Sequence, residues 1–231
     1  KGRPITGEEF DRMILATPKI VGDDAAPTWQ RFLNGLWLCG LRLAEAAALS
    51  WDSDGPVSID LSGRHPVFRF RQEGHKAGTD ALVPMTPDFA EFLLAVPEEY
   101  RHGRVFKLQA RSGSLAPMDK HWVGKVITNI GKAAGVVVDR GTRKNKPFVK
   151  HASAHDLRRS FGARWARKVM PVALMQLMRH ESVETTMRFY VGRNAQDVAD
   201  LLWSTHDEAE TINNLATSGD LAPISTRFQK A

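Results

Sequence analysis

The apolar spacing between Pro27 and Gly40 constrains the fold of this chain more than any other local pattern. Five large side chains recur there every three or four residues, which is the period of one face of an α-helix. Proline is favoured in the first turn of a helix and glycine just after its end, so a helix is predicted between them. With 231 residues, 42% of them hydrophobic, the chain can bury such a face in a sizeable core. The five residues are Trp29, Phe32, Leu33, Leu36 and Trp37.

Further helices and one small sheet are predicted around this segment. Thr6 and Glu9 have the spacing of a capping box, which starts a helix predicted to end near Pro18. Short runs of strand-forming residues between glycine-containing turns predict three strands. The other predicted helices are 43–49, one from residue 87, 118–134, one over 155–169, 171–178 and 182–189, and the strands are 57–61, 67–71 and 81–85. The predicted fold class is α+β and mostly helical.

The charge balance favours a nucleic-acid partner. Lys and Arg total 32 against 26 Asp and Glu, which gives a formal net charge of +6 and a pI near 9.6. A single cysteine, Cys39, cannot form an internal disulfide and suits a reducing compartment such as the cytoplasm. The most apolar segment, Gly35 to Leu49, contains Arg42 and Glu45 and is too short to span a bilayer. A soluble protein without a membrane partner is expected.

Charge is unevenly distributed along the chain. Ten Lys or Arg residues occur with one acid between Arg140 and Lys168, so phosphate contacts are predicted there. From Asp197 to the end, six acids outnumber two bases, and a short apolar face suggests a docking helix. One domain over 1–192 and a tail over 193–231 are expected. The candidates for DNA contact are Arg140, Arg143, Lys144, Lys146, Lys150, Arg159 and Arg179.

Arg42 lies between apolar residues in the sequence GLRLAEAAAL, which predicts a buried environment. An unpaired guanidinium is unfavourable in such a place and needs an anionic partner. Glu45, three residues later on the same helical face, is one such partner. A phosphate is another, held by the outward side of Arg42 while Glu45 supports it from behind. The residues alone leave both interpretations open.

Three more cations are candidates for the same kind of site. His155 and Arg158 are three residues apart, so on a helix they share a face and can donate to one group of oxygens. Lys76 lies between Gly74 and Gly78 in a predicted turn, from which a lysine can act as a general acid. A solvated helix face and a solubilising lysine are the simpler explanations.

His180 and Tyr190 complete a set with a chemical purpose, although alone they could be a cap and a core aromatic. A tyrosine that attacks a phosphodiester needs donors for the charge on the non-bridging oxygens. It also needs an acid for the leaving alkoxide, and a base or nearby cations to help deprotonate the phenol. These residue types supply all three services without a metal or a cofactor.

Four boxes of the sequence resemble those of the tyrosine recombinases, the phage integrase family, in the family's order. They are GLRLAEAAALSWD, HKAGTDALVPM, HDLRRSFGARW and MRHESVETTMRFY. The resemblance covers roughly Thr6 to Val191. It implies a mostly helical catalytic domain, here 1–192, with a small antiparallel three-stranded sheet. The implied catalytic residues are Arg42, Lys76, His155, Arg158, His180 and Tyr190, with Glu45 in support.

The resemblance also implies a reaction and partners. Tyr190 would attack the scissile phosphate of double-stranded DNA, leaving a 3′-phosphotyrosyl link and a 5′-hydroxyl, while Lys76 protonates the leaving oxygen. Strands would be exchanged in a homotetramer on paired DNA sites, assembled through the C-terminal tail. Members of the family usually carry an upstream DNA-binding domain, which this chain is expected to lack.

Two positions depart from the family's pattern, and two other functions stay open. Arg179 stands where glycine is common, which puts the turn geometry in question, and Arg159 stands where histidine is frequent. The alternatives are an architectural DNA-binding module without catalysis and DNA relaxation like that of type IB topoisomerases. A metal-dependent nuclease is less favoured, because the nearby acids show no evident ligand geometry. Those acids are Asp52, Asp54 and Asp60.

Overall fold

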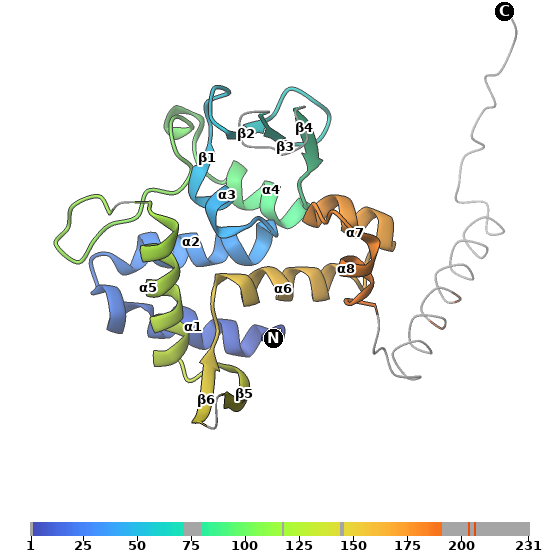
Figure 1. Ribbon diagram of the computed structural model, residues 1–231. Helices are drawn as coiled ribbons and strands as arrows, with labels where there is room; N and C mark the ends of the chain where they lie inside the picture. Colours follow the sequence, from blue (N-terminus) through green and yellow to red (C-terminus); the bar gives the residue numbers. More distant parts are fainter. Residues whose placement is uncertain are drawn as a thin grey trace, which may run out of the picture. The chain divides into compact units, whose positions relative to one another are not determined.

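The computed structural model describes residues 2–71, 80–116, 118–143, 146–190, 203 and 206, without the side chain of Arg143 (Figure 1). The chain divides into two units, Lys1–Phe189 and Tyr190–Ala231. All elements named below belong to the first unit. They are α1 (Gly7–Val21), α2 (Ala26–Cys39), α3 (Leu43–Ala48), β1 (Leu49–Ser50), β2 (Val57–Asp60), β3 (Val67–Phe70), β4 (Ala81–Pro84), α4 (Pro87–Leu94), η2 (Glu98–Tyr100), α5 (Lys120–Ala133), β5 (Val137–Arg143), β6 (Lys146–His151), α6 (Ala154–Trp165), α7 (Pro171–Met178) and α8 (Val183–Met187).

Helix α1 begins as predicted and continues beyond its predicted end. The Thr6 hydroxyl accepts from the Glu9 amide at 3.1 Å, and the Glu9 carboxylate accepts from the Thr6 amide at 3.0 Å. Pro18 lies inside the helix, so the predicted end there is wrong. Because proline has no N–H, the carbonyl of Ile14 loses its helical donor, and Nε2 of Gln30 on α2 donates to it at 3.1 Å. This tertiary contact lets the helix continue to Val21.

Helix α2 supplies several of the largest side chains of the core, and the helix predicted between Pro27 and Gly40 is confirmed. Its Trp29 and Phe32 are fully buried. Gly40 ends the helix with a φ of +65°, and a Cβ at this position would lie 2.4 Å from the Phe161 ring of α6. Glycine is therefore required both by the left-handed backbone and by the close approach of α6. Burial raises the pKa of the neighbouring Cys39 thiol to about 12.

A four-stranded sheet has the order β1-β2-β3-β4. The three predicted strands are present as β2, β3 and β4, and neighbouring strands among them are antiparallel. Phe68 and Phe70 of β3 are buried on one face, where Phe68 contacts Phe89 of α4 at a centroid distance of 5.6 Å. Leu49 was expected to end a helix, but it pairs in parallel with Val57 and forms β1. The sheet thus has one more short strand than predicted.

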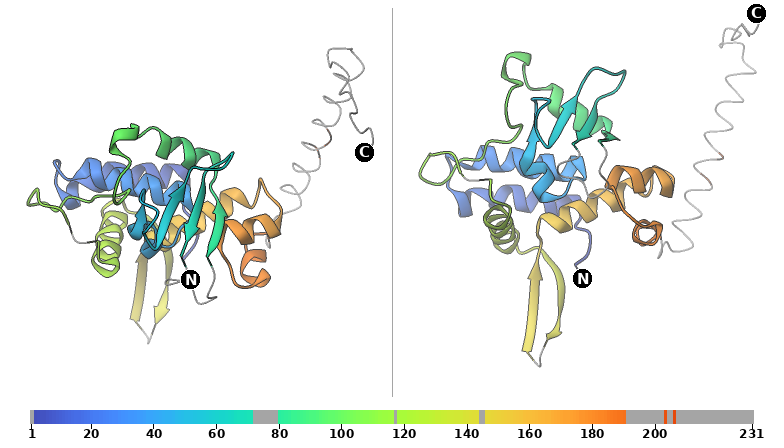
Figure 2. Two further views of the ribbon diagram at one scale, coloured as in Figure 1. Left: turned by 90° about the horizontal axis from the view of Figure 1, so that it is seen from above. Right: turned by 45° about the horizontal axis from the view of Figure 1, so that its top comes forward.

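A second sheet consists of the antiparallel hairpin β5–β6, which the sequence interpretation did not predict. It connects α5 to α6 and extends away from the helices of the first unit (Figures 1 and 2). Residues Lys146–Val149 of β6 are all exposed. Part of the basic segment that begins at Arg140 therefore lies on an exposed ribbon.

The α+β, mostly helical fold class is confirmed, and its antiparallel three-stranded part is extended by β1. The predicted domain boundary after residue 192 stays a prediction, because residues 191–202 lie outside the described part of the chain. Within the described ranges, no helix has both the length and the apolar character to cross a membrane.

Candidate active site

Arg42 caps the N-terminus of α3 and is exposed, contrary to the buried environment predicted from its neighbours. Its backbone is extended, so the side chain leaves the helix while the preceding Leu41 is buried. The Glu45 carboxylate accepts from the Arg42 amide and from Nη1 of the same arginine, both at 2.9 Å. The guanidinium side chain remains 46% exposed. Glu45 thus orients Arg42 and leaves part of its fork open to a ligand.

Arg179 makes a second ion pair with the same carboxylate. Its Nη1 donates to Oε1 of Glu45 at 2.7 Å, and its guanidinium carbon lies 3.6 Å from the ring centroid of Phe70. Arg179 has a φ of +50° and a ψ of +52°, the left-handed conformation that glycine favours. Its carbonyl accepts from Nη2 of Arg42 at 3.2 Å. The turn expected from a glycine therefore forms with an arginine, whose side chain lies inside the network.

Glu45 is the acid at the centre of this network. Burial raises its pKa, but the hydrogen bond from the Arg42 amide and the charges of Arg179 and Arg42 outweigh burial and lower the pKa overall. The side chain is only 14% exposed. A carboxylate in this place holds two arginines together and remains ionised at neutral pH.

Arg158 on α6 is held by carbonyl groups at the ends of two other helices. Nη1 donates to the Gly40 carbonyl and Nη2 to the Met178 carbonyl, and the residue is buried. Burial lowers its pKa to about 10, so the side chain is still a cation at pH 7. A guanidinium has five N–H donors, and these two contacts leave three of them for a ligand. The carbonyls fix the orientation of Arg158 without cancelling its charge.

His155 and Arg158 share a face of α6, as their spacing predicted, and both line a cavity of about 400 Å³ with His180. Partial burial and the charges of Arg159 and Arg158 lower the pKa of His155, against the opposing effect of Asp156. A neutral imidazole at pH 7 can accept a proton. The full lining is Gly2, Pro4, His155, Arg158, Arg159, Met178, His180, Thr185, Arg188 and Phe189.

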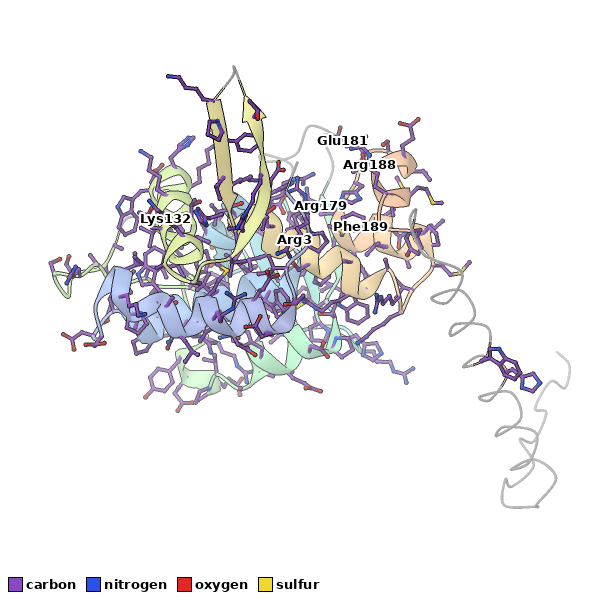
Figure 3. All side chains as sticks on the ribbon, turned by 90° about the horizontal axis from the view of Figure 1, so that it is seen from below. Arg3, Lys132, Arg179, Glu181, Arg188 and Phe189 are labelled. Carbon is purple, nitrogen blue, oxygen red and sulfur yellow. The ribbon has the colours of Figure 1, made fainter. Side chains whose placement is uncertain are left out.

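His180 is fixed by neighbours on and after α8. Its Nδ1 lies 2.9 Å from Oγ1 of the buried Thr186, and its ring stacks on Phe189 at a centroid distance of 5.9 Å. In Figure 3, Arg188 and Phe189 are labelled at the end of the first unit that α7 and α8 form, and Arg179 is labelled nearer its middle. Burial and the charges of Arg158 and Arg42 lower the pKa of His180 to about 4. When the Thr186 hydroxyl donates to Nδ1, the neutral ring carries its proton on Nε2.

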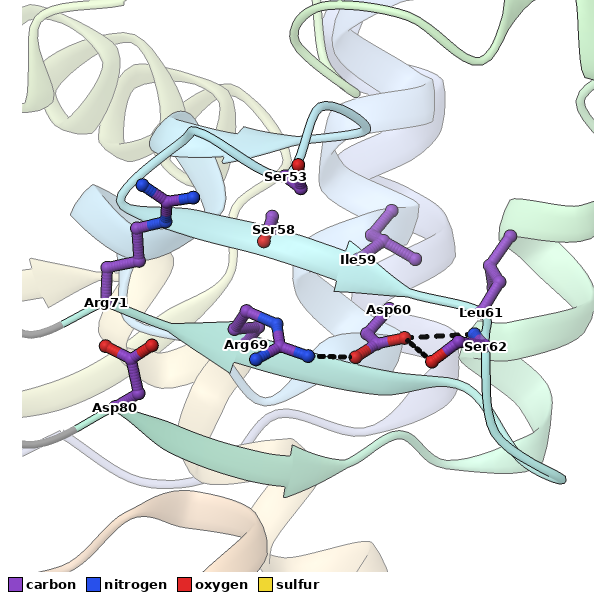
Figure 4. Close-up of a pocket in the computed structure, with 9 residues that line it drawn as sticks. All are labelled: Ser53, Ser58, Ile59, Asp60, Leu61, Ser62, Arg69, Arg71 and Asp80. Carbon is purple, nitrogen blue, oxygen red and sulfur yellow. Dashed lines mark hydrogen bonds and ion pairs between the residues drawn. The ribbon is translucent and has the colours of Figure 1, made fainter.

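Two predicted residues cannot be placed relative to this cluster. Lys76 lies outside the described residues; its described flanks, Arg71 and Asp80, line a hollow of about 650 Å³ on β2–β4 (Figure 4). The dashed contacts in that hollow join Asp60 to Arg69 and Ser62. Tyr190 is half-buried, directly follows Phe189 in the sequence and begins the second unit of the chain.

The predicted DNA contacts of the basic segment fall into several environments. Arg140 and Lys146 are exposed, whereas Lys150 and Arg159 both pair with the buried Asp156, at 3.6 and 2.6 Å. Lys144 and the side chain of Arg143 lie outside the described part. Asp156 also accepts from the amide and hydroxyl of Ser153, which caps α6.

The sequence interpretation missed Thr186, Arg188 and the dual partnership of Glu45. Thr186 is six residues after His180, and the only local signal was Ser182, whose predicted cap folds α8 back toward the histidine. The site contains several His and acidic side chains, but no group of three or more His, Cys, Asp or Glu suitable for a metal occurs among the described residues.

Sequence and fold comparisons give a consistent set of similarities. The sequence profile of the phage integrase family matches residues 4–197. The fold is similar to XerA recombinase (20% identity, TM-score 0.52) and to the Tn1549 transposon integrase in complex with transposon right end DNA (14%, 0.53). It is also similar to a lambda integrase dimer bound to a COC′ core site (15%, 0.54).

These three similarities extend over most of this chain and over part of the other proteins. They cover 88%, 89% and 83% of this chain and 65%, 66% and 61% of the respective structures. The chain thus spans less than two thirds of their length. Among curated proteins, none matches the sequence significantly.

Proposed function

The chain belongs to the phage integrase family, and on that basis we propose that it is a tyrosine-type site-specific recombinase. It cleaves and rejoins double-stranded DNA through a 3′-phosphotyrosyl link on Tyr190. The observation that carries the proposal is a cluster of cations that three separate segments bring around one carboxylate and one cavity. The cluster consists of Arg42, His155, Arg158, Arg179 and His180, with Glu45 as the carboxylate.

The arginines of this cluster suit the charge that develops on a phosphodiester under attack. Arg158 is oriented by two backbone carbonyls and Arg42 by Glu45, so both are in place before DNA binds. Preorganised donors of this kind stabilise a transition state without reorganising during the reaction. When the Thr186 hydroxyl donates to Nδ1, the neutral His180 has an Nε2–H that can donate to a phosphate oxygen.

Proton transfer completes the proposed step. Oη of Tyr190 forms a bond to phosphorus while the bond from phosphorus to the 5′-oxygen breaks. The phenol proton passes to His155, whose lowered pKa keeps it able to accept at pH 7. The 5′-oxygen takes a proton from Lys76. The roles of Tyr190 and Lys76 rest on their sequence boxes alone.

The proposal includes an assembly and a location. Two duplexes exchange strands when a 5′-hydroxyl of one attacks the phosphotyrosyl bond of the other, which requires several protomers on paired sites. We assign that contact to the C-terminal tail, and the assembly to a homotetramer. Cytoplasm is the proposed compartment, since the sole cysteine forms no internal disulfide.

A covalent-trapping experiment tests the reaction. Nicked duplexes that cover the DNA flanking the gene are incubated with the full-length protein, and adducts are separated by denaturing electrophoresis. Loss of the short nicked strand prevents religation, so a covalent adduct should accumulate. Tyr190→Phe should abolish the adduct and still bind DNA, because the substitution removes one hydroxyl.

The other tyrosine of the chain provides the matched control. Tyr100 is 63% exposed, in η2, and Tyr100→Phe should form the adduct like the parent protein. An adduct that persists in Tyr190→Phe would reassign the nucleophile. DNA binding without an adduct in the parent protein would instead support the architectural interpretation.

A further inference from the structure

The hairpin β5–β6 has two chemically different faces. Residues directly opposite in an antiparallel pair point to the same face, and residues two apart on one strand also share it. Phe148 is opposite Gly141, and a Cβ on Gly141 would lie 3.0 Å from the Phe148 ring, so the ring covers the glycine. Lys146 and Lys150 flank Phe148 at two-residue spacing. We call the face with Lys146, Phe148 and Lys150 the inner face.

The inner face is connected to the active-site cavity by charged contacts. Nζ of Lys150 lies 3.6 Å from Oδ1 of Asp156, and Nη1 of Arg159 donates to the same oxygen at 2.6 Å. Arg159 lines the cavity together with His155. Asp156 is fully buried, so its partners rather than its own carboxylate face outward. A line of cations therefore runs from Lys146 along the hairpin to the cavity.

The opposite face has a different environment. Arg140 is opposite Val149 and belongs to this outer face. It lines a separate hollow of about 390 Å³ with Arg3 and Glu9. The acid on the inner face is Asp139, which is opposite Lys150 at the base of the hairpin. On the inner face, the part that is farther from the cavity thus carries Lys146 and the Phe148 ring.

We infer that the inner face of β5–β6 binds the phosphate backbone of duplex DNA beside the cleaved phosphate, and that the outer face does not. This inference rests on the proposed function and divides the basic segment into residues with different tasks. Six residues of β6 extend over about 20 Å at roughly 3.3 Å each, which is the length of about six base pairs. Lys146 neutralises a phosphate, and Phe148 covers the adjacent sugar-phosphate surface.

A matched pair of substitutions tests the assignment. Binding of a 40-base-pair duplex of random sequence is measured by fluorescence anisotropy at several KCl concentrations, with Lys146→Ala and Arg140→Ala compared with the parent. Each lost phosphate contact reduces the slope of log K against log salt by about 0.9. Lys146→Ala should bind several-fold more weakly with a slope reduced by about one contact, whereas Arg140→Ala should match the parent. Equal losses in the two variants would overturn the inference, as would no loss in either.

Three controls keep this test independent of the chemistry. All variants are made in the Tyr190→Phe background, so failure of the cleavage reaction leaves the binding comparison valid. Lys146→Arg keeps the charge and should restore the parental slope, which separates loss of charge from loss of structure. Removing base pairs from the hairpin side of a cognate duplex should eliminate the difference between Lys146→Ala and the parent. A difference that persists on the shortened duplex would contradict the proposed position.

Discussion

Arg179 combines an unfavourable backbone with a favourable ion pair. A left-handed conformation costs a non-glycine residue about 1 kcal/mol relative to glycine, and Arg179 adopts it at a φ of +50°. The ion pair with Glu45 compensates for this strain: Nη1 of Arg179 lies 2.7 Å from Oε1 of Glu45, and each side chain is only 14% exposed. The two effects can be separated, because both glycine and alanine remove the ion pair and the contact of Arg179 with the Phe70 ring, whereas only glycine also removes the backbone strain.

Arg179→Ala should lower the free energy of unfolding by about 2 kcal/mol, as expected for a lost hydrogen bond between charged groups. Arg179→Gly should lose about 1 kcal/mol less, because it accepts the positive φ without strain. Urea denaturation of both variants and the parent measures these differences. Equal stabilities of the two variants would show that the backbone is not strained at this residue.

His180 makes stability depend on pH in a defined window. Its folded-state pKa is about 4 against an ordinary value of 6.5, so the unfolded chain binds the proton more tightly. The contribution of His180 to the free energy of unfolding is therefore complete above about pH 6.5 and is lost as the pH falls from 6.5 toward 4. His155 adds a change of the same sign.

Replacing His180 should flatten this pH dependence. The free energy of unfolding, measured in urea between pH 4 and pH 7.5, should fall less steeply in His180→Gln than in the parent. His121→Gln removes an exposed imidazole from α5 and controls for the loss of a histidine as such. An unchanged slope in His180→Gln would mean that another group causes the dependence.

Spacing along the sequence predicted which residues share a face, but not which residues meet across the fold. The three-residue spacing of His155 and Arg158 predicted the helix face that they share. Arg158 is held by Gly40, 118 residues away, and Glu45 by Arg179, 134 residues away. No local pattern encodes contacts of that separation. Arg42 was misplaced for a related reason, since apolar neighbours fix the burial of the backbone but not the direction of a capping side chain.

At the scale of elements, buried faces were predictable and exposed ones were not. Each of the three predicted strands buries side chains in the core: three successive residues in β2, alternate residues in β3 and Val83 in β4. The four residues at the outer end of β6 are all exposed, so burial imposes no pattern on them that the sequence could reveal. The end of α1 was predicted wrongly for another reason. The donor that replaces the missing amide of Pro18 comes from α2, which lies outside the local sequence.

At the scale of the whole molecule, our proposal places assembly on DNA in the second unit. Its Trp203 is 68% exposed and contacts His206 edge to ring at 6.3 Å. An exposed tryptophan is a strong candidate for an interface anchor, where truncation typically costs 2 kcal/mol or more, roughly thirtyfold in affinity. Trp203→Ala should therefore weaken the formation of multimers on paired sites while leaving the binding of one protomer to one site intact.

Light scattering coupled to size exclusion, with and without DNA, measures this effect. Leu15→Ala provides the control, since Leu15 on α1 is similarly exposed at 75%. It should assemble like the parent protein. Multimers of normal size and affinity in Trp203→Ala would exclude this residue as the anchor of the interface.

The buried thiol of Cys39 can serve as a chemical probe of motions in the core. As the only cysteine, with a pKa of about 12, it can react with an alkylating reagent only when the packing around α2 opens. The carbonyl of the next residue, Gly40, accepts from Arg158, so an opening at this end of α2 disturbs one of the two hydrogen bonds that hold the guanidinium. The rate of alkylation therefore measures how often the packing beside Arg158 opens in the absence of any substrate.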